Sequence, residues 1–179
     1  MGWLFPFQLT NFAPSHSLFS AMPKFDIIKN GTNADLAEVV QARVHEYLHH
    51  ICEPEELIQL DGVHSFTFGT VQINVKVIPW HTEDVLVSIY SYICEDVRLN
   101  EKLASELLRI NATTPFGSFG ITYDNCVVFN YAIPGANLDY KEFLACLQTV
   151  AALADSYDEK VLEMNTPDQA VGQAFDNLS

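Results

Sequence analysis

Residues 70–77 read TVQINVKV, and this short stretch decides the class of the fold. An aliphatic side chain stands at every second position from Val71 to Val77, and polar side chains stand between them. Successive side chains of a β-strand point to opposite faces, so a period of two predicts a strand with one buried face and one wetter face. The chain therefore contains a sheet that covers a core on one side.

Other strand-like stretches lie on both sides of this one. The segment SFTF at 65–68 predicts a short strand just before it. DVLVSIYSYIC at 84–94 is apolar on both faces apart from two serines, so we expect a central strand that is covered on each side, or on one side and at an interface. FGSFGITY at 116–123 and CVVFNYAI at 126–133 predict a hairpin, because the residues between them favour a turn.

Three segments carry helical spacing instead. Apolar residues recur at intervals of three and four over 33–51 and again over 99–111. A third segment runs from Asp139 to Val161 and opens with Asp139-x-x-Glu142, which has the form of a capping box. The resulting order is α-β-β-β-α-β-β-α. Helices segregated between and after runs of strands are typical of an α+β domain, so we expect a largely antiparallel five-stranded sheet with helices packed on it.

Length and composition fit one domain with loose ends. A chain of 179 residues that is 49% apolar can bury a sizeable core. We divide it into an aromatic N-terminal extension at 1–30, a folded domain at 31–164 and a polar C-terminal tail at 165–179. The N-terminus has no Lys or Arg before Lys24, unlike a signal peptide, and no stretch approaches the roughly 20 apolar residues that span a bilayer. We therefore expect no membrane partner and a cytoplasmic location.

Charge and cysteine spacing argue against several classes of function. Nine basic against 23 acidic residues give a formal net charge of −14, and nucleic-acid binding depends on Lys and Arg, so we expect no DNA or RNA partner. The acidic run Asp155, Asp158 and Glu159 is interpreted as a solvated helix face. No C-x-x-C pair is present, which argues against a zinc ribbon or a thioredoxin-like redox pair. We expect four reduced, buried thiols, at Cys52, Cys94, Cys126 and Cys146.

The stretch HEYLH at 45–49 fits the H-E-x-x-H pattern of zinc hydrolases. In that pattern His45 and His49 would bind the metal and Glu46 would act as the base. At about 100° per residue, however, the apolar stripe of this helix is centred near Val40, and both histidines fall on the opposite side. The sequence therefore predicts that they face away from the core of their own subunit.

A zinc-dependent hydrolase is kept as the alternative hypothesis. Glu83, Glu95 or Glu106 could supply a third ligand from elsewhere in the chain. A further possibility is that Glu38 and the two histidines bind a transition metal loosely, without catalysis. We assign no catalytic, cofactor-binding or metal residue and expect no cofactor, because the chain also lacks a phosphate loop and a G-x-S-x-G elbow.

One part of the chain carries a recognisable combination of features. A Leu-rich helix ends at Asn111 and is followed by a glycine-marked strand, a hairpin and a final helix, with the signature pairs Phe116-Gly117, Phe119-Gly120, Ile133-Pro134 and Ala154-Asp155. In these features residues 107–162 resemble the YbjN family, which shares its fold with the type III secretion chaperones. With the preceding helix and strands, the resemblance covers about residues 33–163.

The resemblance implies a small sheet with helices on one face, usually a homodimer, and a chaperone-like or regulatory role in which a protein or peptide partner is held without catalysis. The residue pattern agrees with a dimer, because one layer of helices would leave the second apolar face of strands 85–94 and 126–133 exposed. A monomer with the N-terminal extension as a lid is the competing account. We expect Trp3 to Phe12 to lie on an apolar patch, so that deletion of residues 1–21 raises the binding of an apolar dye.

Overall fold

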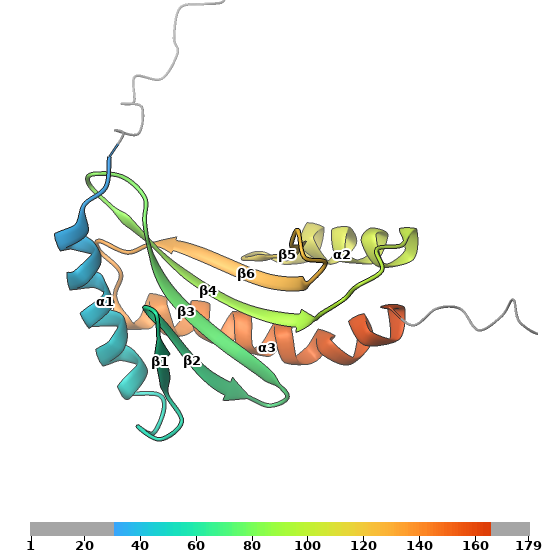
Figure 1. Cartoon of the computed structure of the whole chain (residues 1–179), viewed down its shortest axis with the longest axis horizontal. Coiled ribbons are helices and arrows are strands. Elements are labelled where there is room, and N and C mark those ends of the chain that lie inside the picture. Colours follow the sequence, from blue (N-terminus) through green and yellow to red (C-terminus); the bar gives the residue numbers. More distant parts are fainter. Residues whose placement is uncertain (1–30, 166–179) are drawn as a thin grey trace, which may run out of the picture.

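The structure, a computed structural model, describes residues 31–165 (Figure 1). The expected extension, the placement of Trp3 to Phe12 and all but the first residue of the expected tail lie outside these residues. The described chain forms three helices and six strands: α1 (Ala34–His49), β1 (Ile58–Leu60), β2 (Val63–Phe68), β3 (Val71–Pro79), β4 (Val85–Cys94), α2 (Glu101–Thr113), β5 (Ser118–Ile121), β6 (Val127–Pro134) and α3 (Tyr140–Asn165). None of these helices is long and apolar enough to cross a bilayer.

The six strands form one sheet in the order β1-β2-β3-β4-β6-β5, and every neighbouring pair is antiparallel. The helices pack on one face of it: α1 contacts β3 and β4, α3 contacts β3, β4 and β6, and α2 lies against β5 beside α3. Figure 1 looks onto the other face, and α3 passes behind the strands. The predicted α+β class with a largely antiparallel sheet is confirmed.

The sheet has six strands where the sequence predicted five. The additional strand is β1, which pairs with β2 through a two-residue turn at Asp61 and Gly62. Both turn residues have positive φ, 51° and 77°, which matches the type I′ turn that Asp-Gly favours in hairpins. The prediction placed only a loop here, because β1 is three exposed residues long and shows no alternation of burial.

The strand that opened the sequence analysis is confirmed as β3. Its aliphatic side chains at Val71, Ile73 and Val75 are buried against the helices. The polar residue Asn74 is also buried. Its Oδ1 accepts a hydrogen bond of 2.8 Å from Ser65 Oγ on β2. Burial of this pair is tolerated because each polar atom has a partner.

The central strand β4 is covered by helices on one side only. Val85, Val87 and Ile89 on that side are completely buried. On the helix-free side Leu86 is partly buried, and Tyr92 is 51% exposed. The prediction of a strand with apolar residues on both faces is therefore correct, and the second face remains open in the described chain.

Candidate functional site

Three histidines from two elements form a connected cluster. His45 and His49 lie one turn apart on α1, and His64 lies on β2. His45 Nδ1 is 3.1 Å from His64 Nε2, and His45 Nε2 is 3.1 Å from His49 Nε2. His64 is only 1% exposed, His45 is partly buried and His49 is exposed. The cluster therefore connects the core to the solvent through the His45 ring.

The predicted orientation of the two helix histidines is right for His49 and wrong for His45. The β1–β2 hairpin packs beside α1, where Gln59 lines a small hollow together with Gln41 and His45. His45 is thus covered on one flank and reaches His64. The predicted apolar stripe is correct, but its neighbours on the sheet could not be placed from the helix alone.

The described residues provide no third ligand for a catalytic zinc. Across residues 31–165, no group of three or more His, Cys, Asp and Glu side chains is arranged to hold a metal ion, so Glu83, Glu95 and Glu106 do not complete a site. The motif's Glu46 is exposed. A catalytic zinc needs three convergent protein ligands and an open position, and this arrangement is not found here.

Sequence reasoning missed His64. The predicted strand was SFTF at 65–68 and did not include His64, whereas β2 begins at Val63. Alternation with the buried Phe66 two positions later is the signal that could have placed His64 on the core side. Burial, and then the nearby His45 and His49 rings, lower the pKa of His64 from its ordinary value of 6.5, so its neutral form is favoured.

A second candidate site is an apolar cavity of about 550 Å³ between β6 and α3. Its walls come from helix-facing side chains of β6, from the loop after β6 and from one face of α3. The apolar and aromatic part of its lining includes Phe116, Tyr131, Ile133, Leu138, Ala145 and Cys146. A cavity of this size and composition suits one or two apolar side chains.

The sheet leaves part of β6 without a neighbour beside this cavity. β5 pairs only with Val127 to Asn130, so the outer edge of Tyr131 to Pro134 carries no strand in the described chain. The predicted strand at 116–123 was longer than the observed β5. It begins later because Gly117, with a φ of 76°, turns the chain before Ser118, and it ends at Ile121 because a turn closed by a 3.0 Å hydrogen bond from the Asn125 N–H to the Thr122 carbonyl follows.

The outer edge of β5 itself is covered. Asn111 on α2 donates to the Phe119 carbonyl oxygen at 3.0 Å and accepts from the Phe119 N–H at 2.7 Å. A side-chain amide thus occupies both backbone groups that another strand would use at this position. The free backbone on this side of the sheet is therefore the part of β6 next to the cavity.

Two polar groups that line the cavity, the Tyr131 hydroxyl and the Cys146 thiol, remain uncharged near neutral pH. Burial, and then a hydrogen bond with the Cys146 thiol, raise the pKa of Tyr131 to about 12, and burial also raises the pKa of Cys146. Phe116 is 58% exposed and stacks on Tyr131 with ring centres 5.7 Å apart. The cavity therefore has an apolar lining with an exposed aromatic ring at its border.

The loop that borders the cavity is held by side chains from two other elements. Asp84 accepts a hydrogen bond of 2.8 Å from the Ala136 N–H, and Arg43 on α1 donates to the Ala136 carbonyl at 3.0 Å. Tyr47 donates to the Leu138 carbonyl at 3.3 Å. These contacts fix the loop before any ligand is bound, which lowers the ordering cost of binding.

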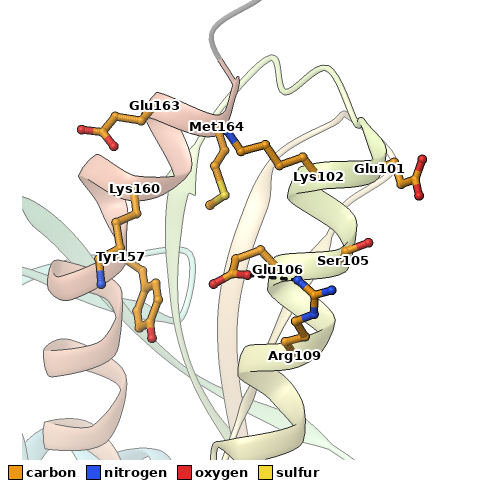
Figure 2. Close-up of a pocket in the computed structure, with 9 residues that line it drawn as sticks. All are labelled: Glu101, Lys102, Ser105, Glu106, Arg109, Tyr157, Lys160, Glu163 and Met164. Carbon is orange, nitrogen blue, oxygen red and sulfur yellow. Dashed lines mark ion pairs between the residues drawn. The ribbon is translucent and has the colours of Figure 1, made fainter. Parts of the chain in front are cut away.

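A third, open groove of about 780 Å³ lies between α2 and α3 (Figure 2). Its walls carry charged side chains of both signs, and Glu106 forms an ion pair with Arg109 at 3.9 Å. On α3 the Lys160 ammonium lies 4.5 Å from the centre of the Tyr157 ring. Mixed charges in an open groove are screened by water and favour neither an apolar segment nor one charged ligand. We therefore place the candidate binding site at the β6 cavity.

The acidic run on α3 is only partly a solvated face. Asp155 Oδ1 accepts from the Thr70 N–H at 3.0 Å and from the Thr70 hydroxyl at 3.2 Å, and Asp158 also accepts from that hydroxyl. The solvated-face interpretation is thus wrong for these two residues and fits only the exposed Glu159. It failed because the sequence could not show that α3 passes behind the β2–β3 turn.

The thiols agree with the sequence prediction. Cys52, Cys94, Cys126 and Cys146 are all buried and free. Burial is the largest cause of a raised pKa at each of them, so all four remain protonated near neutral pH. None is arranged as a reactive nucleophile.

Comparison with solved structures supports this fold. A chain in the crystal structure of the ExsC–ExsE complex superposes with a TM-score of 0.55 at 21% sequence identity, over 70% of this chain and 96% of that chain. The likeness shows a shared fold, as the resemblance in the sequence predicted. No curated protein sequence matches this chain.

The comparison with protein families covers nearly all of the described residues. The model of the family described as T3SS (YopN, CesT) and YbjN peptide-binding chaperone 1 matches residues 34–164. This span begins at the first residue of α1 and ends one residue before the last of α3. The chain therefore belongs to the TY-Chap1 family of peptide-binding chaperones.

Proposed function

We propose that this chain is a non-catalytic chaperone that binds an extended, apolar segment of a partner protein along the free part of β6. The observation that carries this proposal is the unpaired outer edge of Tyr131 to Pro134 directly beside the apolar cavity. Membership of a peptide-binding chaperone family supports it.

Strand addition explains how both features are used together. A segment that pairs with Tyr131 to Ile133 would satisfy backbone groups that β5 does not reach. Alternate side chains of an added strand point to opposite faces, so every second residue would face α3 and one could enter the cavity. Phe116 would then pack on the inserted side chain. Backbone pairing supplies affinity, and the cavity selects the inserted residue.

Charge favours a basic segment. The chain carries a formal net charge of −14, and Glu142 and Asp84 both border the cavity. Lysine or arginine on either side of the apolar residues would be attracted by this field and would speed association. The preferred segment is thus apolar at alternate positions and basic at its ends.

The test uses short synthetic peptides of about ten residues, the length of a long strand. They alternate apolar and polar residues, with lysines or glutamates at the ends, and binding to the full chain is measured by fluorescence anisotropy. We expect the lysine-flanked peptides to bind better. Ala145→Trp should weaken binding about tenfold or more, because Ala145 is an exposed residue of α3 that lines the cavity.

The matched control is Ala152→Trp. Ala152 is also an exposed residue of α3 but does not line the cavity, so this change should leave peptide binding intact. Equal binding by both tryptophan variants would place the peptide elsewhere on the molecule. A panel in which no peptide binds the wild type would contradict the proposed function itself.

We also infer that two copies pair through the helix-free face of the sheet. Tyr90 and Tyr92 contact each other there at a ring distance of 5.5 Å, and Ile78 is 37% exposed on the same face. Light scattering should give the mass of a dimer for the wild type and of a monomer for Tyr92→Asp. Tyr123→Asp is the control, because Tyr123 is fully exposed in a turn. A monomeric wild type would contradict this inference.

A reducing compartment such as the cytoplasm fits the free thiols. All four cysteines in the described chain are unpaired and buried, and secreted domains commonly pair theirs. Fractionation of the native cell, with an antibody against the chain, would test this location. Recovery from an oxidising compartment would contradict it.

Action by binding, without catalysis, is part of the proposal. The competing zinc hydrolase would need His45 and His49 to share a metal with a third protein ligand near Glu46. Among residues 31–165 no third protein ligand converges on these two histidines. A protease assay on zinc-loaded protein would overturn this part of the proposal if Glu46→Gln abolished cleavage.

A further inference from the structure

The histidine cluster of α1 and β2 has no part in the proposed peptide binding. The cluster lies where α1 meets the β1–β2 hairpin, whereas the cavity lies between β6 and α3. Two of the three rings come from the H-E-x-x-H stretch, and the third, His64, comes from the sheet. The cluster therefore calls for its own physical explanation.

The spacing of the two helix histidines fits a metal ion. A metal ion at 2.0–2.1 Å from two imidazole nitrogens holds those nitrogens roughly 3.0–3.4 Å apart. The Nε2 atoms of His45 and His49 lie 3.1 Å apart, and their rings are nearly perpendicular, at 84°. His49 is exposed, so its ring can exchange its proton with water and turn its lone pair toward an ion. The pair is already at the separation that a shared ion requires.

His64 supplies the support that a ligating histidine usually has. A histidine that binds a metal through one nitrogen commonly donates its other N–H to a fixed acceptor, which sets its tautomer. His45 Nδ1 lies 3.1 Å from His64 Nε2, and His64 is buried on β2. Nε2 of a neutral His64 can accept a hydrogen bond from the His45 Nδ1–H, which leaves the Nε2 lone pair of His45 directed away from the core. The buried ring is thus placed as an acceptor for His45.

We propose that His45 and His49 form a surface site for one late first-row transition metal ion (Cu²⁺, Ni²⁺ or Zn²⁺), with His64 as the positioning residue that orients His45. Only two protein ligands take part, since no third one converges among residues 31–165, and water completes the coordination. Imidazole nitrogens select these ions over Mg²⁺ and Ca²⁺, which prefer oxygen. The site binds a metal without catalysing a reaction.

The experiment titrates the full chain, purified without a histidine tag, with Cu²⁺, Ni²⁺, Zn²⁺ and Mg²⁺ in a calorimeter. We expect saturable binding of one ion, tightest for Cu²⁺ and absent for Mg²⁺, because affinity rises along this series to copper. His49→Ala should abolish it while the fold is kept, since His49 is exposed. His50→Ala is the matched control, because His50 is an exposed histidine at the end of the same helix outside the cluster.

The proposed role of His64 is tested by the metal affinity of His64 variants and by the tautomer of His45. His64→Leu should weaken metal binding about 10- to 100-fold, the usual cost of removing a partner of a ligating histidine, and His64→Gln should restore most of it by supplying an acceptor oxygen. Nitrogen NMR of the imidazoles should show His45 protonated at Nδ1 in the wild type and a mixture of tautomers in His64→Leu. Binding that survives His49→Ala, or that is adventitious and shows no saturation, would overturn the proposal. Metal binding and peptide binding are measured separately, so the failure of one leaves the other intact.

Discussion

His45 Nδ1 lies 3.1 Å from Nε2 of His64, and the burial of His64 makes this junction between α1 and the sheet sensitive to acid. The folded pKa of His64 is lower than its ordinary value of 6.5. The unfolded chain therefore binds this proton more readily, so the stability that neutral His64 contributes is complete above pH 6.5 and is lost as pH falls below it. In urea unfolding, the free energy of unfolding should fall by up to about 1.4 kcal/mol in addition for each pH unit below 6.5.

Two substitutions test the assignment of this loss to His64. His64→Gln keeps a polar side chain but does not titrate, so its free energy of unfolding should fall less steeply below pH 6.5 than that of the wild type. His50→Gln removes an exposed histidine and should follow the wild-type curve. Parallel curves for all three proteins would show that another group is responsible.

Gly135, just after β6, is predicted to tolerate no side chain. A Cβ at this position would lie 2.9 Å from Val85 and 3.0 Å from Val40, and both valines are completely buried. Gly135→Ala should therefore lower the free energy of unfolding by about 1–3 kcal/mol through overpacking. Gly120→Ala is the control, because its Cβ would meet only Val128 at an ordinary 3.8 Å. Similar thermal midpoints for the two variants would contradict the packing argument.

The contact between Thr70 and α3 gives a third prediction. Asp155→Ala removes the acceptor of the Thr70 N–H and should lower the free energy of unfolding by about 1–2 kcal/mol. Glu159→Ala, on the same helix, should change it by less than about 0.5 kcal/mol because Glu159 is exposed. Guanidinium unfolding of both variants measures the difference. An unaltered Asp155→Ala protein would mean that water replaces the lost contact.

Local periodicity made most of the fold predictable. The alternation from Val71 to Val75 identified a strand with a buried face, and the capping box at Asp139 located the start of α3, where Glu142 N donates to Asp139 Oδ1 at 2.9 Å. Both signals depend on neighbours within a few residues. The missed strand β1 lacked such a signal because all three of its residues are exposed.

The candidate sites depend on contacts between distant parts of the chain, which periodicity does not describe. Tyr131 and Cys146 were correctly assigned to a strand and a helix, but the cavity between them lies beside the part of β6 that β5 does not reach, because β5 begins only at Ser118. Likewise, His45 was correctly placed off the apolar stripe, yet its partner comes from 19 residues further along the chain. The elements that carry these residues were predictable from local patterns, whereas the contacts between the residues form only when the elements pack together.

Alanine substitutions at the two buried serines of β4 are predicted to change the free energy of unfolding in opposite directions. Ser91 Oγ is fully buried and has no hydrogen-bond partner within residues 31–165, whereas Ser88 Oγ donates to Asn130 Oδ1 at 3.2 Å. Burying a hydroxyl removes it from water, and without a hydrogen-bond partner this loss of solvation is not offset. Ser91→Ala should therefore raise the free energy of unfolding by about 1 kcal/mol, and Ser88→Ala should lower it by a similar amount. Urea titrations of both alanine variants and the wild type should place the midpoint of Ser91→Ala above the wild-type midpoint and that of Ser88→Ala below it. A lower midpoint for Ser91→Ala would mean that the Ser91 hydroxyl has a partner, such as a buried water molecule.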